Sequence, residues 1–194
     1  MRILAATNNK NKLEEFSRIL GPLGVSVVCP EDLDIEVQVQ ETGKTFAENA
    51  YLKARAFFEE SGLPSLADDS GLCVEALKGR PGVDSATYQG ENATYPQRIA
   101  ALLDELKDTP EEQRTARFVS AICCVMDEET MLTCEGICIG KIGTAPAGEG
   151  GFGYDPIFYQ GDRSFAQLDP QEKDAVSHRG KALREFAELL DEMI

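Results

Sequence analysis

The sequence predicts an α/β fold, in which short apolar strands alternate with amphipathic helices. Apolar runs at residues 2–7 and 25–29 flank a segment, residues 13–20, whose apolar side chains recur at helical spacing. The alternation continues along the 194-residue chain without an internal repeat, a linker or a low-complexity segment. We therefore expect one domain spanning residues 1–194.

In the first third of the chain, Gly21-Pro22 ends the first helix and residues 25–29 form the second strand. Residues 35–39 alternate apolar with polar side chains, which predicts a half-exposed strand. Thr45 and Glu48 have the spacing of a capping box, so the next helix should run to about residue 61.

A brief apolar run at residues 63–67 should form a strand that ends at two adjacent aspartates, and a second run follows them. Glycines in the rest of the chain predict a turn at residues 79–82 and a loop at residues 143–154. The loop is either mobile or shaped for close backbone approach. The other elements expected are strands at 72–77 and 156–159, helices at 99–106, from 169 and at 180–193, and a hairpin of 118–126 with 131–142.

The composition argues against some classes of binding partner and indicates where the protein is found. The 34 acidic residues exceed the 19 lysines and arginines, giving a formal charge of −15, which argues against nonspecific binding of nucleic acid or an anionic membrane surface. Residues 3–6 are too short an apolar run for a signal peptide and no run has the length of a membrane span, so we expect a cytoplasmic protein. The six cysteines are scattered through apolar segments, as is typical of buried, reduced thiols.

A polar loop joins the first strand to the first helix. It reads Thr7-Asn8-Asn9-Lys10-Asn11-Lys12, without the glycine spacing of a Walker loop. Amide groups at a helix start, together with Lys12, can bind phosphate. Alternatively, the asparagines adopt turn conformations in a solvated loop.

Two adjacent carboxylates, Asp68 and Asp69, precede Ser70, and Glu41 is a possible partner for them. Neighbouring carboxylates repel each other unless a cation or proton lies between them, so the pair is a candidate Mg²⁺ site. The alternative is that one aspartate caps a turn and the other is solvated.

Two further groups lie near the carboxyl end. Phe152, Gly153, Tyr154 and Asp155 combine aromatic rings with a carboxylate and can stack and hydrogen-bond a planar base, unless Phe152 simply belongs to the core. The other candidates are Lys173, His178 and Arg179, near the start of the last helix. Their alternative is a surface or structural role. A phosphate-binding loop, a metal site, a base platform and hydrogen-bond donors together describe a nucleotide site.

With these segments, the chain resembles the inosine triphosphate pyrophosphatase family, the XTP/dITP diphosphatases. The similarity runs nearly end to end, through residues 7–12, 41–50, 53–55, 67–72, 150–156 and 177–180. It implies an elongated, two-lobed α/β fold with a long mixed β-sheet flanked by helices, a nucleotide cleft between the lobes, Mg²⁺ dependence and a homodimer.

The resemblance also implies residue roles. Glu41 and Asp69 would bind the metal, and Asp69 or Asp68 would accept a proton from the attacking water. The substrate-binding residues it implies are Thr7, Asn8, Asn9, Lys10, Asn11, Lys12, Lys53, Ser70, Phe152, Gly153, Tyr154, Asp155, Lys173, His178 and Arg179.

The implied reaction is attack of metal-assisted water on the α-phosphorus of ITP, dITP or XTP, which yields the nucleoside monophosphate and pyrophosphate. This activity would keep deaminated bases out of DNA and RNA. Two alternatives remain: a pyrophosphatase for another modified nucleotide, and a sensor that binds nucleotides without hydrolysing them.

Overall fold

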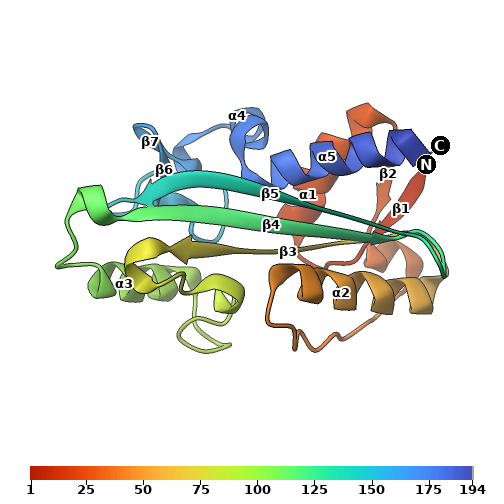
Figure 1. Ribbon diagram of the computed structural model, residues 1–194, viewed down its shortest axis with the longest axis horizontal. Helices are drawn as coiled ribbons and strands as arrows, with labels where there is room; N and C mark the ends of the chain where they lie inside the picture. The colour runs from red at the N-terminus through yellow and green to blue at the C-terminus, as the bar shows by residue number, and fades with distance from the viewer. Residues whose placement is uncertain (194) are drawn as a thin grey trace. The chain divides into compact units, whose positions relative to one another are not determined.

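A computed structural model describes residues 1–193 and confirms the α/β class. Seven strands form one mixed sheet in the order β2-β1-β3-β4-β5-β6-β7 (Figure 1). β1 pairs in parallel with β2 and β3, and β6 pairs antiparallel with β5 and β7. The strands are β1 (Arg2–Ala5), β2 (Ser26–Val28), β3 (Ser65–Val74), β4 (Thr115–Val125), β5 (Met131–Ile142), β6 (Phe158–Gln160) and β7 (Arg163–Ser164). None of the helices within the described range is long and apolar enough to cross a membrane.

The helices begin where capping residues predict. Asn9 caps α1 (Lys10–Leu20), and Thr45 with Glu48 forms the expected capping box of α2 (Phe46–Ser61). Similar boxes start α3 (Tyr95–Glu105) and α4 (Pro170–Val176). The last helix, α5 (His178–Met193), begins two residues before the predicted start.

Two sequence-based predictions are wrong. Residues 35–39 form no strand in the structure of residues 1–193; Ile35, Val37 and Val39 instead pack, partly buried, against the core beside α2. Their alternation reflects contact with that core rather than pairing with a strand. The aspartates do not end a strand either, because β3 continues through them from Ser65 to Val74.

The chain divides into two compact units. Unit 1 comprises residues 1–69 and 120–136 and the chain from His178 onward, and unit 2 comprises Ser70–Val119 and Ile137–Ser177. All six cysteines are free thiols.

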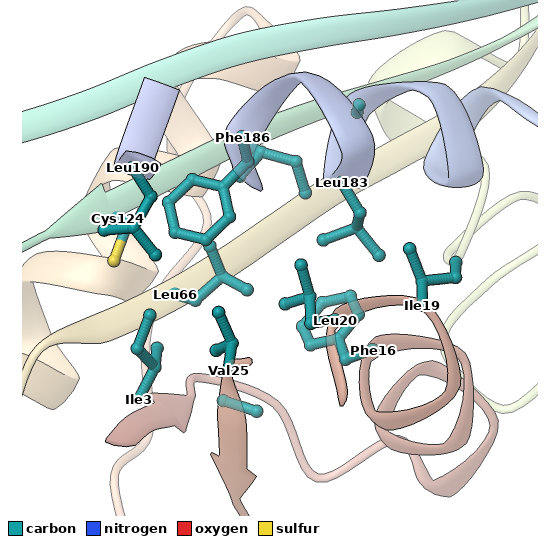
Figure 2. Close-up of a cluster of buried hydrophobic side chains, with 13 residues drawn as sticks. Ile3, Phe16, Ile19, Leu20, Val25, Leu66, Cys124, Leu183, Phe186 and Leu190 are labelled. Carbon is teal, nitrogen blue, oxygen red and sulfur yellow. The ribbon is translucent and has the colours of Figure 1, made fainter. Parts of the chain in front are cut away.

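Unit 1 has a hydrophobic cluster on each face of its strands. Phe16, Leu20 and Phe186 pack with Leu66 and other residues between the strands and helices α1 and α5 (Figure 2). A second cluster covers the side of α2 and includes Ala50, Ala54, Phe57, Ala67 and Ala121. Successive strand residues point to opposite faces. Leu66 therefore marks the face of β3 toward α1 and α5, and Ala67 marks the face toward α2.

Unit 2 has its own aromatic core. Phe118 lies 4.4 Å from Phe158 and 5.7 Å from Phe165 between ring centroids. Leucines from β3 and α3, including Leu72 and Leu102, complete the cluster. Each unit therefore buries its own apolar residues.

Gly136 lets α5 approach β5 closely. A Cβ built on Gly136 would lie 2.0 Å from the carbonyl oxygen of His178 and 2.6 Å from the backbone nitrogen of Ala182. Any side chain there displaces the first turn of α5, because both neighbouring atoms belong to the helix backbone. By contrast, a Cβ on Gly21 would meet no atom within 4 Å.

We predict that Gly136→Ala lowers the free energy of unfolding by about 1–3 kcal/mol, the usual cost of overpacking. The matched variant Gly21→Ala should change it by less than about 1 kcal/mol, since Gly21 has ordinary right-handed backbone and open space beside it. Urea unfolding followed by circular dichroism measures both. Equal stability of the two variants would contradict the close approach.

Candidate active site

Asp68 and Asp69 lie next to each other in β3, at the point where its neighbour β1 ends. β1 pairs with β3 only at Ser65 and Leu66, and the chain then leaves the sheet through the loop of residues 7–12. Strand alternation sends the two carboxylates to opposite faces of the sheet. Asp68 follows Leu66 to the side of α1 and α5, whereas Asp69 follows Ala67 to the side of α2.

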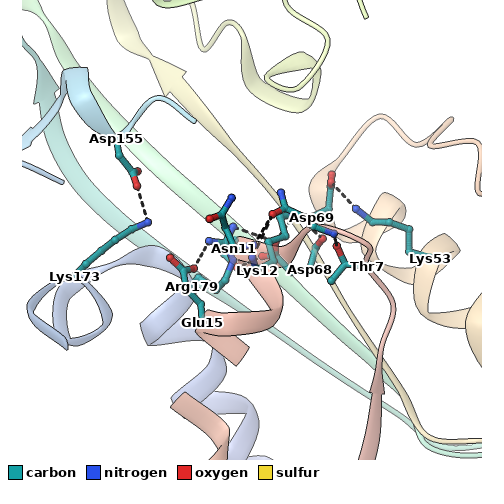
Figure 3. Close-up of polar contacts among 12 residues, drawn as sticks. Thr7, Asn11, Lys12, Glu15, Lys53, Asp68, Asp69, Asp155, Lys173 and Arg179 are labelled. Carbon is teal, nitrogen blue, oxygen red and sulfur yellow. Dashed lines mark hydrogen bonds and ion pairs between the residues drawn. The ribbon is translucent and has the colours of Figure 1, made fainter. Parts of the chain in front are cut away.

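Asp68 is the centre of a buried ion-pair network within unit 1 (Figure 3). Its Oδ2 lies 2.7 Å from Lys12 Nζ and 3.2 Å from Arg179 Nη2, and its Oδ1 accepts a hydrogen bond from the Ser120 hydroxyl. Arg179 also pairs with Glu15, at 2.6 Å between Nη1 and Oε2. α1 supplies two members of this network, and α5, β3 and β4 supply one each.

These contacts decide the ionisation of Asp68. Burial alone would raise the pKa of this carboxyl, but Arg179 and Lys12 hold it well below its usual range. For Lys12 the balance is reversed: burial lowers its pKa, and the attraction of Asp68 only partly opposes that shift. Asp68 is therefore a charged anchor for two cations at neutral pH and a poor acceptor of protons.

Asp69 has a different environment. Its Oδ1 lies 3.0 Å from Lys53 Nζ, which also contacts Glu41 Oε2 at 3.2 Å. Its other oxygen, Oδ2, is buried and accepts no hydrogen bond from any of residues 1–193. Burial raises the pKa of Asp69 to about 6, although Lys53 opposes the shift, and a carboxyl with that pKa can take up a proton near neutral pH.

The first turn of α2 positions Glu41. The amides of Lys44 and Thr45 donate to Glu48, and the amide of Gly43 donates to the side chain of Asn49 at 2.8 Å. A Cβ on Gly43 would lie 2.6 Å from that same Asn49 oxygen, so the segment fits closely against the helix. Glu41 itself stays exposed, with 45% of its side chain accessible.

The donor set suits a hard cation in part. Glu41 and Asp69 each place an oxygen near the same ammonium nitrogen, and carboxylate oxygens are the ligands that Mg²⁺ prefers. No group of three or more His, Cys, Asp or Glu side chains in the described chain is arranged to hold a metal ion. Since Mg²⁺ commonly uses one or two carboxylates together with water and phosphate oxygens, the two residues fit that mode of binding.

The loop of residues 7–12 is partly committed to its own structure. The Asn9 side chain accepts hydrogen bonds from the amides of Asn11 and Lys12, and the Asn9 amide donates to the Thr7 hydroxyl. This geometry exposes Asn8, Lys10 and Asn11 beside the start of α1. The helix predicted after this loop is confirmed, and it begins within the loop, at Lys10.

In unit 2, Asp155 organises the aromatic loop. Its Oδ2 accepts from the amide of Phe152 at 3.0 Å and from Lys173 Nζ at 2.6 Å, and that same nitrogen lies 4.5 Å from the centroid of the Phe152 ring. A Cβ on Gly151 would lie 2.2 Å from Asp155 Oδ2. Of the two interpretations of this glycine-rich loop, close backbone approach is the correct one here.

Tyr154 and Gly153 fix the other side of the loop. The Tyr154 hydroxyl donates to the Ser85 carbonyl at 2.6 Å, and its ring meets Tyr95 edge-on with centroids 5.4 Å apart. Gly153 has φ +65°, and a Cβ there would approach the Tyr95 ring. Both tyrosines thus support the backbone that carries Phe152.

Most predicted residues fall into one of two groups. Unit 1 brings together Lys12, Lys53, Glu41, Asp68, Asp69 and Arg179, and unit 2 brings together Phe152, Gly153, Tyr154, Asp155 and Lys173. His178 is buried at the start of α5 in unit 1, and Ser70 follows Asp69 in β3.

The sequence analysis missed Glu15 and Ser120. Glu15 has a signal, because it occupies the buried face of α1 that carries Phe16 and Ile19. Ser120 has a weaker one, as a single hydroxyl in the otherwise apolar run of β4. A polar residue in a buried position needs a partner, and both prove to have one in this network.

A family model described as the Ham1 family matches residues 3–189. The chain belongs to the Ham1 family. This membership confirms the resemblance seen in the sequence, because relatives carry the same activity in their names.

A dITP/XTP pyrophosphatase of Geobacillus kaustophilus is 47% identical over 99% of this chain and 95% of its own length. One of Nocardia farcinica is 49% identical, over 94% of this chain and 91% of its own. Among solved structures, a HAM1 protein from Coxiella burnetii has a TM-score of 0.89 and 42% identity, covering 99% of both chains. The fold described above is therefore also found in an experimentally solved relative.

We predict opposite stability effects for the two aspartates. Asp69→Asn should raise the free energy of unfolding by about 1–3 kcal/mol at pH 7.5, because it removes a buried charge whose folded pKa lies above the unfolded value of 3.8. The folded state binds the extra proton, so the penalty in the parent protein grows as pH rises through 4 to 6. The gain should therefore shrink by roughly half at pH 5.

Asp68→Asn is the matched control and should lower stability by about 3–5 kcal/mol at pH 7.5, because it removes the counter-charge of Lys12 and leaves Arg179 with Glu15 alone of its two carboxylates. The low pKa of Asp68 means that the folded state favours its charged form, and this stabilisation is lost as pH falls below the unfolded value. Urea unfolding in EDTA at several pH values measures both variants. A destabilised Asp69→Asn protein would show that its burial is not costly.

Proposed function

We propose that this protein hydrolyses deaminated purine nucleoside triphosphates, namely ITP, dITP and XTP, to the monophosphate and pyrophosphate. The relatives named dITP/XTP pyrophosphatases support the reaction. The observation that carries the proposal is the contrast between the two aspartates: Asp68 is held as a charged anchor, while Asp69 combines a raised pKa with a buried oxygen that no residue of 1–193 engages.

In this proposal Asp69 accepts the proton of the water that attacks the α-phosphorus. Its environment suits a general base, since a pKa near 6 leaves it ionised at neutral pH yet able to take up a proton. The pKa of Asp68 is too low for that role. On this ground we assign the proton acceptor to Asp69 rather than to Asp68, the two candidates between which the sequence does not choose.

Lys12 and Lys53, with the loop of residues 7–12, would hold the triphosphate. Both lysines already face carboxylates, and the exposed residues Asn8, Lys10 and Asn11 lie beside the start of α1. Glu41 and Asp69 would hold Mg²⁺, which when bound neutralises charge on the phosphate oxygens. Ser70 follows directly in β3 and is proposed to touch the substrate.

The base and sugar are assigned to the aromatic loop, Lys173, His178 and Arg179. Phe152 offers a ring for stacking, and the Asp155–Lys173 pair holds the loop in place at 2.6 Å. His178 and Arg179 can donate to a keto oxygen at position 6 of the purine, whereas the amino group of adenine offers another donor. An unpaired buried donor costs about 1–3 kcal/mol, or roughly 5- to 150-fold in discrimination.

Homodimeric assembly and a cytoplasmic location complete the proposal. The first rests on the resemblance to the family and the second on the short apolar runs of the sequence. Two alternatives are tested together with it: a pyrophosphatase for another nucleotide, and a sensor that does not hydrolyse.

We predict that, with Mg²⁺, the purified protein converts ITP, dITP and XTP to monophosphate and pyrophosphate and consumes little ATP or GTP. Ion-exchange separation of nucleotides together with assays for phosphate and pyrophosphate identifies the bond cleaved. IDP with phosphate would place the attack at the γ-phosphorus, and tight binding without turnover would favour the sensor.

Asp69→Asn should reduce kcat at least about 100-fold, the typical contribution of a general base, with the fold retained by circular dichroism.

The base platform gives a separate prediction. Phe152→Ala should raise KM for ITP about 10-fold, because base–aromatic stacking contributes roughly 1–3 kcal/mol, and should leave kcat within about threefold. Phe152→Tyr keeps the ring and is the matched control. Steady-state kinetics of both variants checks this, and a loss confined to kcat would remove Phe152 from substrate binding.

A further inference from the structure

The ammonium group of Lys53 joins the two carboxylates to which the metal is assigned. Lys53 Nζ lies 3.0 Å from Asp69 Oδ1 (Figure 3) and 3.2 Å from Glu41 Oε2. Only 13% of its side chain is exposed, so these are its principal contacts with charge.

We infer that Lys53 is a built-in counter-cation that exchanges partners: it neutralises Glu41 and Asp69 until a divalent cation takes over these carboxylates, and it then pairs with substrate phosphate. The inference rests on the proposed assignment of Glu41 and Asp69 as metal ligands. It adds that Lys53 opposes the binding of metal alone and that both carboxylates oppose the binding of phosphate alone.

The balance of charge at Lys53 links the binding of metal to the binding of phosphate. Glu41 and Asp69 together carry −2 when ionised, and Lys53 reduces that to −1 at contact distance. A divalent cation that binds the carboxylates must compete with this ammonium, and phosphate that binds the ammonium must compete with the carboxylates. Metal and phosphate therefore favour each other's binding, by the same factor in both directions.

Lys12 shows that this arrangement is particular to Lys53. It also contacts an aspartate, Asp68, at 2.7 Å, but that carboxylate is shared with Arg179 and hydrogen-bonded by Ser120. Asp68 keeps two partners when Lys12 turns to phosphate. Glu41 and Asp69, in contrast, share a single ammonium.

The first test measures Mn²⁺ binding to the full chain without nucleotide, from the electron paramagnetic resonance signal of free Mn²⁺. Mn²⁺ prefers the same oxygen ligands as Mg²⁺. Lys53→Met removes the charge but keeps the apolar stem, and it should bind Mn²⁺ roughly tenfold or more tightly than the parent. Lys78→Met removes a charge from an exposed position in unit 2 and should change the affinity by less than about threefold, because Lys78 makes no ion pair with either carboxylate in the described chain.

The second test is the reciprocal one and uses inorganic pyrophosphate in EDTA, measured by isothermal titration calorimetry. Glu41→Gln should bind metal-free pyrophosphate several-fold more tightly than the parent, because Lys53 loses one competing carboxylate. Glu14→Gln removes an equal charge from an exposed position on α1 and is the matched control. Glu41 is exposed, so this arm remains decisive even if Lys53→Met does not fold.

Three results would overturn the inference: Lys53→Met binding Mn²⁺ no more tightly than the parent, Lys78→Met gaining as much as Lys53→Met, or Glu41→Gln gaining no pyrophosphate affinity over Glu14→Gln. Asp69→Asn separates this failure from a failure of the proposed function. If that variant binds Mn²⁺ like the parent, the metal assignment falls together with the exchange. If it loses Mn²⁺ while one of the three results is found, only the exchange falls.

Discussion

The buried carboxylate of Asp68 is the charge around which the candidate site of unit 1 is organised. It holds Lys12 of α1 and Arg179 of α5 on one oxygen and receives the Ser120 hydroxyl of β4 on the other. Removing a single member of such a network leaves a buried charge without compensation, which costs far more than the intact network contributes. The relative positions of two helices and two strands thus depend on one side chain.

Strand geometry explains how adjacent aspartates acquire unlike properties. Asp68 points to the face of the sheet that α1 and α5 cover, where cations depress its pKa. Asp69 points to the side of α2, where burial prevails over Lys53 and raises its pKa to about 6. A charged anchor and a carboxyl with a raised pKa therefore follow each other in sequence, and the second carries a destabilising charge. Such a charge is expected where a site is arranged for chemistry rather than for stability.

In unit 2, one carboxylate likewise holds several groups of the loop that carries Phe152. Asp155 serves the backbone of Phe152 and the ammonium of Lys173 with a single oxygen, and Gly151 leaves room for it. Tyr95 and Tyr154 support the loop through ring contact and a hydrogen bond to Ser85. The aromatic ring assigned to the base is thus fixed by contacts within its own unit, which reduces the entropy lost on binding.

The α/β class, the capped starts of helices such as α2 and the residue types of the candidate site follow from the sequence alone, because these depend on local periodicity, capping and side-chain chemistry. The resemblance to the family is also visible there. The sequence could not show that residues 35–39 pack without pairing, since alternation is the same for a strand and for an extended segment lying on a core. The completion of the Asp68 network by Glu15 and Ser120, the link from Lys53 to Glu41 and Asp69, and the choice of the anchoring aspartate become visible in the folded chain. Partners far apart in the chain meet through packing of helices on the sheet, and a pKa depends on that packing rather than on neighbours in sequence.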